Sequence, residues 1–275
     1  MPLINIVNYE EGFNDGILTK FAKELGKIEG ATIKNLPDSK ADINHHINYL
    51  PYRHTDTINT LMVTHIFEGY KIDRLREHIK KADMGICFSP QTMDMLIEKG
   101  LPREKLTYVL PAHDERPRRP LVISILTNVY PDGCKREYML NELAKVIDKE
   151  KFVFRIMGKG WQPLLEPLVA DGLQVQYFTE YDKDLQNSIL DSADYYLYFG
   201  EDEGSMGLLD AVQAGVKTIS TPQGFHLDIG LDYQFSSQEE LNEIFKKLQY
   251  NPVEDWTWDR FRKQHIEIWN DLRHS

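Results

Sequence analysis

The sequence predicts an α/β protein of two domains, each built on a parallel β-sheet with helices on both faces. Three observations carry this prediction. The chain has 275 residues, which suits two domains of ordinary size. Short apolar runs alternate with amphipathic stretches in both halves, as expected for strands joined by helical crossovers. A charged, proline-bearing stretch at 113–120 separates the halves and is the predicted linker.

The first half is predicted to contain six strands and three helices. In its first helix, Ile17, Phe21 and Leu25 recur at helical spacing, and Gly26 ends it. Gly100 ends the third helix. The predicted strands are 4–8, 31–36, 43–48, 60–65, 82–89 and 106–110, and the predicted helices are 17–25, 72–80 and 90–99.

The second half repeats the alternation without repeating the sequence. It opens with Leu121–Leu126, a continuous apolar run typical of a parallel strand covered on both faces. The C-terminal stretch 256–272 is predicted to be a helix with one aromatic, apolar face. The other predicted strands are 152–157, 173–178, 195–199 and 216–220, and the other helices are 137–147, 184–190 and 206–214. The whole pattern predicts two Rossmann-like domains facing a cleft.

Composition excludes several classes of protein. The net charge of −11, nearly all of it in residues 119–275, argues against nucleic-acid binding. No apolar run approaches the ~20 residues of a membrane span, and residues 1–7 lack the basic region of a signal peptide. Cys87 and Cys134 are too few for a disulfide framework or a thiolate zinc site, so we expect a cytoplasmic protein. No Gly-x-Gly-x-x-Gly follows the first strand, which disfavours a dehydrogenase.

The segment 200–215 is the most informative for chemistry. It follows a predicted strand, opens a helix, and carries acidic side chains at 201–203 and at Asp210. Helix N–H groups can hold a diphosphate, and Asp210 could accept hydrogen bonds from ribose hydroxyls. Acids before a helix are also what plain capping produces. From the residues alone, a ligand site and a capped core helix remain equally open.

The same segment resembles the donor-site signature of retaining GT-B glycosyltransferases, above all family 4. In that family an acid, seven residues and a second acid precede Ala-x-x-x-Gly and an apolar strand. Asp202 and Asp210 have this spacing, followed by Ala211 and Gly215. Glu203 is the alternative first acid, although it leaves one residue too few. The resemblance implies a GT-B fold with an acceptor domain at 1–118, a donor domain at 119–255, and a terminal helix at 256–275 crossing back.

The resemblance also implies residues that bind the donor. Lys135 would hold the donor phosphates, and Asn128 stands where the family has an arginine, with Arg136 as a neighbouring substitute. Gly158 belongs to a strand-end Gly-x-Gly turn. The other implied residues are Tyr177 and Phe178 at the nucleobase and Ser205, Met206 and Gly207 at the diphosphate. The structural alternatives are a solvated loop lysine, a plain turn and a core aromatic pair.

In the first half, the resemblance singles out His65 after the fourth predicted strand. It would face the reacting sugar, the alternative being a structural histidine. His45 and His46 end another strand and are predicted to line the acceptor side, because parallel strands present their carboxyl ends to the cleft. No third ligand stands near this pair, so no metal site is predicted. Gly12 and Gly16 occupy the place of the family's glycine-rich loop.

These observations predict a hexosyltransferase that moves a sugar from a nucleotide-diphosphate sugar to a glycan, lipid-linked or protein acceptor in glycan or polysaccharide biosynthesis. The resemblance implies retention of configuration. The expected catalytic residues are His65, Lys135 and Asp202 or Glu203, with no cofactor or metal, because cations and a helix terminus would neutralise the leaving diphosphate. Basic residues within 71–81 predict at most weak peripheral membrane contact. The alternatives are a nucleotide-sugar-binding pseudo-enzyme or partner subunit, and a nucleotide-sugar epimerase.

Overall fold

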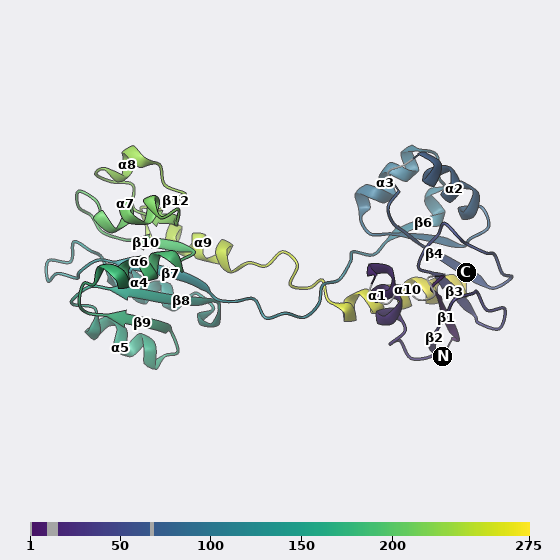
Figure 1. The fold of residues 1–275 in the computed structure, drawn as a ribbon, viewed down its shortest axis with the longest axis horizontal. Coiled ribbons are helices and arrows are strands. Elements are labelled where there is room, and N and C mark those ends of the chain that lie inside the picture. Colours follow the sequence, from purple (N-terminus) through teal and green to yellow (C-terminus); the bar gives the residue numbers. More distant parts are fainter. Residues whose placement is uncertain (1, 10–15, 67–68) are drawn as a thin grey trace. The chain divides into compact units, whose positions relative to one another are not determined.

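The computed structural model describes residues 2–9, 16–66 and 69–275, and these form two compact units. The first unit comprises Met1–Glu115 together with Pro252–Ser275, and the second comprises Arg116–Asn251. The chain therefore leaves the first unit, builds the whole second unit and returns (Figure 1). The passage from Glu115 to Arg116 lies inside the stretch 113–120.

The first unit is built on one sheet of six parallel strands in the order β2-β1-β3-β4-β5-β6. From β1 the chain first adds β2 on one side and then builds β3 to β6 on the other, so the strand order reverses between β1 and β3. The strands are β1 (Ile4–Val7), β2 (Ala31–Lys34), β3 (Ile43–His46), β4 (Ile58–Val63), β5 (Met84–Cys87) and β6 (Leu106–Tyr108).

Helices from both ends of the chain cover this sheet. They are α1 (Ile17–Leu25), α2 (Gly69–Ile79), α3 (Pro90–Glu98) and α10 (Trp258–His274), with a 3-10 turn at Arg103–Lys105. The C-terminal α10 packs on α1, where the Phe21 ring lies 5.4 Å from Phe261 and 5.5 Å from Trp258. Trp269 of α10 donates a hydrogen bond of 3.1 Å to Thr60 in β4. The terminal helix is thus part of the first unit's core.

The second unit is built on a sheet of six parallel strands in the order β12-β11-β10-β7-β8-β9. Here the order reverses between β7 and β10, as in a Rossmann fold. The strands are β7 (Leu121–Leu126), β8 (Phe152–Met157), β9 (Gln174–Phe178), β10 (Tyr195–Tyr198), β11 (Lys217–Ser220) and β12 (Tyr233–Gln234). The predicted fold class, two Rossmann-like α/β domains with parallel sheets, is confirmed.

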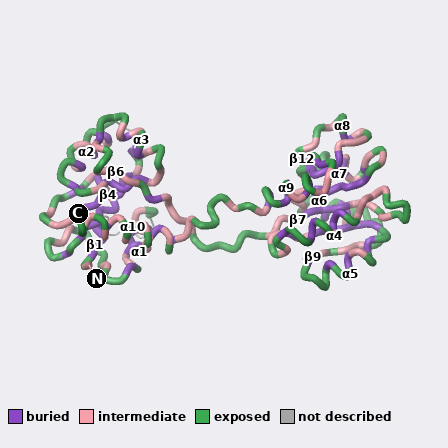
Figure 2. Tube along the Cα trace, turned by 180° about the vertical axis from the view of Figure 1, so that it is seen from behind, coloured by how far each residue is buried: buried purple, intermediate pink, exposed green. Residues whose placement is uncertain are grey.

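Helices enclose the second sheet and its aromatic core. Phe152 and Phe154 of β8 pack on Phe245, with ring centroids 5.1 and 6.3 Å apart, and Trp161 is fully buried in the same cluster. Figure 2 shows buried positions along the strands of both units and exposed positions on the outer helix faces. The helices are α4 (Tyr138–Ala144), α5 (Gln162–Ala170), α6 (Lys183–Asp191), α7 (Met206–Gln213), α8 (His226–Ile229) and α9 (Gln238–Gln249), with a 3-10 turn at Lys149–Lys151.

The structure adds elements that the sequence pattern did not predict. The strand at 216–220 is not the last one, because β12 pairs in parallel with β11. Helices α5, α8 and α9 were also missing from the prediction. In α5, Pro167 lies inside the helix, where it removes one backbone hydrogen bond, while Leu165 and Leu168 are buried. Tertiary burial therefore overrides the helix-breaking signal in α5.

Candidate functional site

A pocket of about 450 Å³ lies at the carboxyl end of the second sheet. Its walls are residues 126–128 after β7, 157–159 after β8 and 179–181 after β9, together with Gln186 and the first residues of α7. Helix α7 follows β10, so the pocket lies where the strand order reverses between β7 and β10. Open α/β sheets bind ligands at such a reversal.

Two glycines allow the backbone to close tightly around this pocket. Gly158 has φ +145°, and a Cβ there would lie 2.0 Å from the carbonyl oxygen of Thr127. At Gly207, in the first turn of α7, a Cβ would lie 2.7 Å from the Tyr196 hydroxyl and 3.0 Å from the Leu126 Cβ. Side chains at these positions would push α7 and the loop after β8 away from β7.

Replacing Gly158 by alanine is expected to lower the free energy of unfolding of the second unit by about 2 kcal/mol or more. The loss combines backbone strain at positive φ with the clash on Thr127. Urea unfolding measures it. Gly172→Ala is the matched control, because Gly172 has φ +91° but open space around it. Equal losses in the two variants would contradict the proposed contact.

Asp210 presents a carboxylate to the pocket from the second turn of α7. Its Oδ2 accepts a hydrogen bond of 2.6 Å from Gln186 Nε2 on α6. The Gln186 side chain is buried, at 5% exposure, and its Oε1 has no hydrogen-bond partner among the described residues. Gln186 therefore orients the Asp210 carboxylate, whose other lone pairs suit hydroxyl donors.

The first turn of α7 carries no side-chain cap. The Ser205 hydroxyl, at the N-cap position, bonds the Tyr196 hydroxyl at 2.7 Å instead. The Ser205 backbone N–H donates to His226 Nε2 at 2.8 Å, so His226 carries its hydrogen on Nδ1 and donates it to Thr221 O at 3.1 Å. This buried network fixes the start of α7 and leaves the N–H groups of Met206 and Gly207, which line the pocket, unbonded to a cap. Such groups favour an anion.

Lys135 and Asp202 pair with one another beside the loop that precedes α7. The Lys135 ammonium contacts the Asp202 carboxylate, and both side chains are mostly buried, at 14% and 16% exposure. The Tyr198 hydroxyl donates to both Asp202 oxygens at 2.7 Å and accepts from Lys135 Nζ at 2.8 Å. The three side chains therefore form one closed cluster.

The contacts with Lys135 and Tyr198 in this cluster determine the protonation state of Asp202. Burial by itself raises the pKa of this carboxyl, but the hydrogen bonds from Lys135 and Tyr198 outweigh burial, and the pKa lies below its ordinary value. Burial and the neighbouring carboxylate raise the pKa of Tyr198. At neutral pH Asp202 is thus a carboxylate and Tyr198 a protonated phenol.

The other predicted donor-side cations lie away from the pocket walls. Arg136, at φ +45°, donates from Nε to the Phe199 carbonyl at 2.8 Å and pairs with Glu201 at 2.6 Å. Neither Arg136 nor Lys135 lines the pocket. Lys159 is the cation that does, and sequence analysis missed it. Its signal was its position two residues after β8, which ends at the sheet's carboxyl edge.

Asn128 lines the pocket and ties two loops together. Its side-chain Oδ1 accepts a hydrogen bond of 2.7 Å from the Lys159 backbone N–H. The Lys159 side chain pairs with Glu180 at 3.3 Å, and both are well exposed. Glu180 and the exposed Tyr181 were also missed. Both follow β9, two and three residues after Phe178, which belongs to the aromatic pair predicted to hold the nucleobase.

The predicted nucleobase residues belong to the strand rather than to the pocket wall. Tyr177 is half-buried against the core of the second unit, and the Phe178 carbonyl accepts a hydrogen bond of 2.9 Å from Gly158 N. The pocket is lined by the three residues after them, 179–181. Glu203, the alternative first acid, is exposed, and its backbone carbonyl accepts from Phe225 N at 3.1 Å.

In the first unit, the structure separates the predicted residues from one another. His65 follows β4 and lines a pocket of about 410 Å³. Gly16 is the exposed N-cap of α1, and Gly12 lies outside the described residues. His45 and His46 have no exposed area. Burial makes these two histidines part of the core, not of an acceptor-facing surface, and corrects the prediction made for them.

Hydrogen bonds inside the core engage both ring nitrogens of His46 and one of His45, whose Nε2 is buried without a partner among the described residues. His45 Nδ1 bonds the Thr60 hydroxyl at 2.8 Å. His46 Nε2 donates to Asn59 Oδ1 at 3.4 Å, and its Nδ1 accepts from the Tyr9 hydroxyl at 2.9 Å. Within the described residues, no group of three or more His, Cys, Asp or Glu side chains is placed to hold a metal ion.

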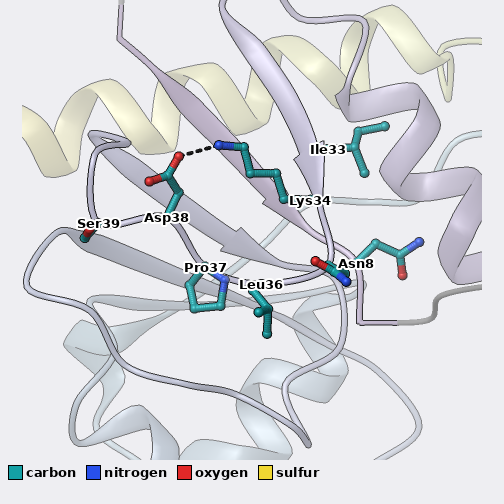
Figure 3. Close-up of a pocket in the computed structure, with 8 residues that line it drawn as sticks. Asn8, Ile33, Lys34, Leu36, Pro37, Asp38 and Ser39 are labelled. Carbon is teal, nitrogen blue, oxygen red and sulfur yellow. Dashed lines mark hydrogen bonds and ion pairs between the residues drawn. The ribbon is translucent and has the colours of Figure 1, made fainter.

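A wide hollow of about 680 Å³ lies elsewhere on the first unit, beside the ends of β1 and β2 (Figure 3). Of the described residues that line it, the charged ones are Lys34 and Asp38, and they form an ion pair with each other. Leu36 and Pro37 form part of its wall. The described part of the lining thus presents no charge that lacks a partner.

The basic residues of α2 are partly neutralised by their neighbours. Arg74 pairs with Glu77 at 3.4 Å and Arg76 with Asp73 at 2.5 Å. Membrane contact through this helix stays a prediction. Of the helices in the described part of the chain, none has the length and apolar character that crossing a membrane requires.

Comparisons with known proteins return structures only. No protein-family model matches the sequence, and no curated protein does. Solved structures similar to this chain include Anabaena Alr3699/HepE in complex with UDP and glucose, at 10% identity over 98% of this chain and 100% of that one, with a TM-score of 0.41.

Two further similar structures align with this chain over almost the full length of both proteins. The lipopolysaccharide outer core galactosyltransferase WaaB matches at 13% identity over 100% of this chain and 99% of that one, with a TM-score of 0.39. WaaG, a glycosyltransferase involved in lipopolysaccharide biosynthesis, matches at 14% identity over 94% of each chain, with a TM-score of 0.38.

Proposed function

We propose that this chain is a glycosyltransferase whose second unit binds a nucleotide-diphosphate sugar. One observation carries the proposal: the pocket at the strand-order reversal combines an oriented carboxylate, Asp210, with the uncapped start of α7. A nucleotide needs a partner for its ribose hydroxyls and a partner for its phosphates. This pocket offers both within one helix turn.

Each residue has a defined task in this proposal. Asp210 accepts hydrogen bonds from the ribose hydroxyls, and the first-turn N–H groups of α7, with Lys159, face the diphosphate. Donor binding draws the Lys135 ammonium from Asp202 to the diphosphate, which leaves the Asp202 carboxylate to contact the sugar. Negative charge develops on the diphosphate as the bond to the sugar breaks, and these donors stabilise it. We further propose transfer of a hexose with retention and without a metal ion.

The proposal is tested by thermal unfolding with UDP, GDP and ADP in buffer that contains EDTA. At ~100 times its dissociation constant, the correct nucleotide adds ~2.7 kcal/mol to the free energy of unfolding. Asp210→Asn keeps the bond to Gln186 but loses the carboxylate charge, so we expect a much smaller shift. Asp228→Asn, an exposed acid of the same unit, should leave the shift unchanged. No shift with any nucleotide would contradict the donor site.

A second candidate is a nucleotide-sugar-binding protein without catalysis. Two observations favour it: Asn128 stands in the place of the expected arginine, and Lys135 is engaged by Asp202. Slow hydrolysis of the bound nucleotide sugar separates the two candidates, because only an enzyme accelerates it. Binding with no hydrolysis and no transfer would favour the second.

A further inference from the structure

The first unit holds a pocket of about 410 Å³ with a lining unlike that of the donor pocket. It opens beside α1, past the carboxyl ends of β4 and β5. Most of its lining is apolar, and the rings of Phe21 and Phe88 lie side by side in it, 4.8 Å apart. The polar lining residues are Thr64, His65 and Thr92.

The charges of the two pockets differ completely. None of the described residues that line the first-unit pocket is Asp, Glu, Lys or Arg. The donor pocket, in contrast, is lined by Lys159, Glu180 and Asp210. A charged group that entered the first-unit pocket would lose hydration without gaining a counter-charge. The described part of the lining therefore favours an uncharged, apolar group.

Apolar surface at the mouth of the pocket is left exposed. Ile17, the first residue of α1, lines the pocket and is 55% exposed, while Phe21 one turn further is buried. A ligand that covered Ile17 would remove this apolar surface from water, which favours binding. The volume also suits a group of one or two rings, since a cavity of about 150 Å³ holds benzene.

Besides Thr64, His65 adds a directional polar group to this apolar lining. Its backbone lies at φ +53°, a region that residues other than glycine rarely adopt. Its ring makes no hydrogen bond with another described residue, whereas the Thr92 hydroxyl already bonds Ser89 at 2.9 Å. The imidazole at the pocket is thus available to bond a hydroxyl.

We infer that this pocket binds the aromatic part of an uncharged acceptor whose hydroxyl group hydrogen-bonds His65. The inference deepens the proposed function, because the word acceptor rests on it. The pocket itself belongs to the first unit alone, so its ligand can be tested separately from the nucleotide.

The experiment compares two ring compounds that differ only in charge, naphthalene-2-methanol and 2-naphthoate. Their dissociation constants for the full chain are measured by saturation-transfer NMR titration. We expect the alcohol to bind at least about tenfold more tightly, because the carboxylate has no counter-charge in the pocket. Equal affinities, or tighter binding of 2-naphthoate, would overturn the inference.

Two variants place the alcohol in this pocket. Ile17→Asp puts a charge at the mouth, and an acid at the start of α1 suits the helix, so the unit should fold. Ala112→Leu places a larger apolar side chain in the pocket from the loop that contains residue 112. Each is expected to weaken binding of naphthalene-2-methanol about tenfold. The control Leu36→Asp, in the hollow of Figure 3 and 46% exposed, should change it less than about twofold.

The outcomes for the two pockets are distinguishable. Nucleotide binding without binding of the alcohol overturns this inference and leaves the proposed function standing. Binding of the alcohol without binding of any nucleotide overturns the proposed function, and with it the inference that the bound group belongs to an acceptor. Weakening by Leu36→Asp as large as that by Ile17→Asp would also overturn the inference, because the site would then not be this pocket.

Discussion

Replacing Lys135 by alanine is expected to lower the rate of sugar transfer about 100- to 1000-fold, the usual effect of removing one donor that stabilises a developing oxyanion. Lys135 is mostly buried in its pair with Asp202, and no other lysine shares that cluster in the described structure. In the proposed mechanism its ammonium moves to the leaving diphosphate and helps Lys159 and the first-turn N–H groups of α7 to neutralise it. Initial rates at saturating donor measure the effect.

Two further variants test whether the loss of rate is specific to Lys135. Lys145→Ala removes an exposed lysine of the same unit whose ion pair in the described structure is with Glu142, so the rate should stay within about twofold. Lys159→Ala removes the cation that lines the pocket and should weaken donor binding more than it slows transfer. A Lys135→Ala enzyme with the wild-type rate would refute the assignment, and a large loss in Lys159→Ala alone would transfer the role to Lys159.

Local sequence signals were enough for the elements that their own residues specify. The bounds of β7 and β8 were predicted to the residue, because each is a short segment that is apolar except at one position, Ser124 in β7 and Arg155 in β8. Helix α9 was missed although its signal was present: Ser237 accepts from Glu240 N, and buried residues follow at helical spacing. The two-residue β12 has no period to detect, so only its pairing with β11 reveals it.

The residues of the candidate site also fall into those that the local sequence could place and those that it could not. The spacing of Asp202 and Asp210 follows from one loop and one helix, so the sequence could place both near the start of α7. Their partners come from distant segments: Gln186 reaches Asp210 from α6, and Lys135 reaches Asp202 across 67 residues. Such pairings depend on how the elements pack, and a single sequence carries no signal for them.

The histidines were mispredicted for a related reason. A histidine at a strand end looks the same in the sequence whether solvent or a helix covers it. His45 is covered by α10, whose His265 and Trp269 rings lie 5.2 and 5.4 Å away. That helix begins more than two hundred residues later in the chain. The resemblance implied that this helix crosses back to the first unit, but not that its rings cover His45, so the burial of His45 was not predicted.

Acidification is expected to destabilise the first unit by several kcal/mol between pH 6.5 and 4. Burial lowers the pKa of His265 to about 4 and that of His46 to about 4, and it lowers the pKa of His45 as well. Above pH 6.5 neither state binds a proton at these rings. Below it, the unfolded chain binds protons that the folded unit excludes, so stability falls until the pH reaches the folded pKa. Each of the first two histidines contributes about 3 kcal/mol over this window.

The variant His265→Asn isolates one of these contributions. His265 Nδ1 donates to the Phe261 carbonyl at 2.9 Å, and an asparagine amide can make the same bond without titrating. We expect the acid-induced loss to shrink by about 3 kcal/mol, whereas His274→Asn, an exposed histidine on the same helix, should leave it unchanged. Urea titrations at several pH values, read by pulsed hydrogen exchange of peptides from β3 and β8, follow the two units separately. If both variants kept the wild-type loss, the proton would be taken up elsewhere, and the buried His265 would not be the group that ties the stability of this core to pH.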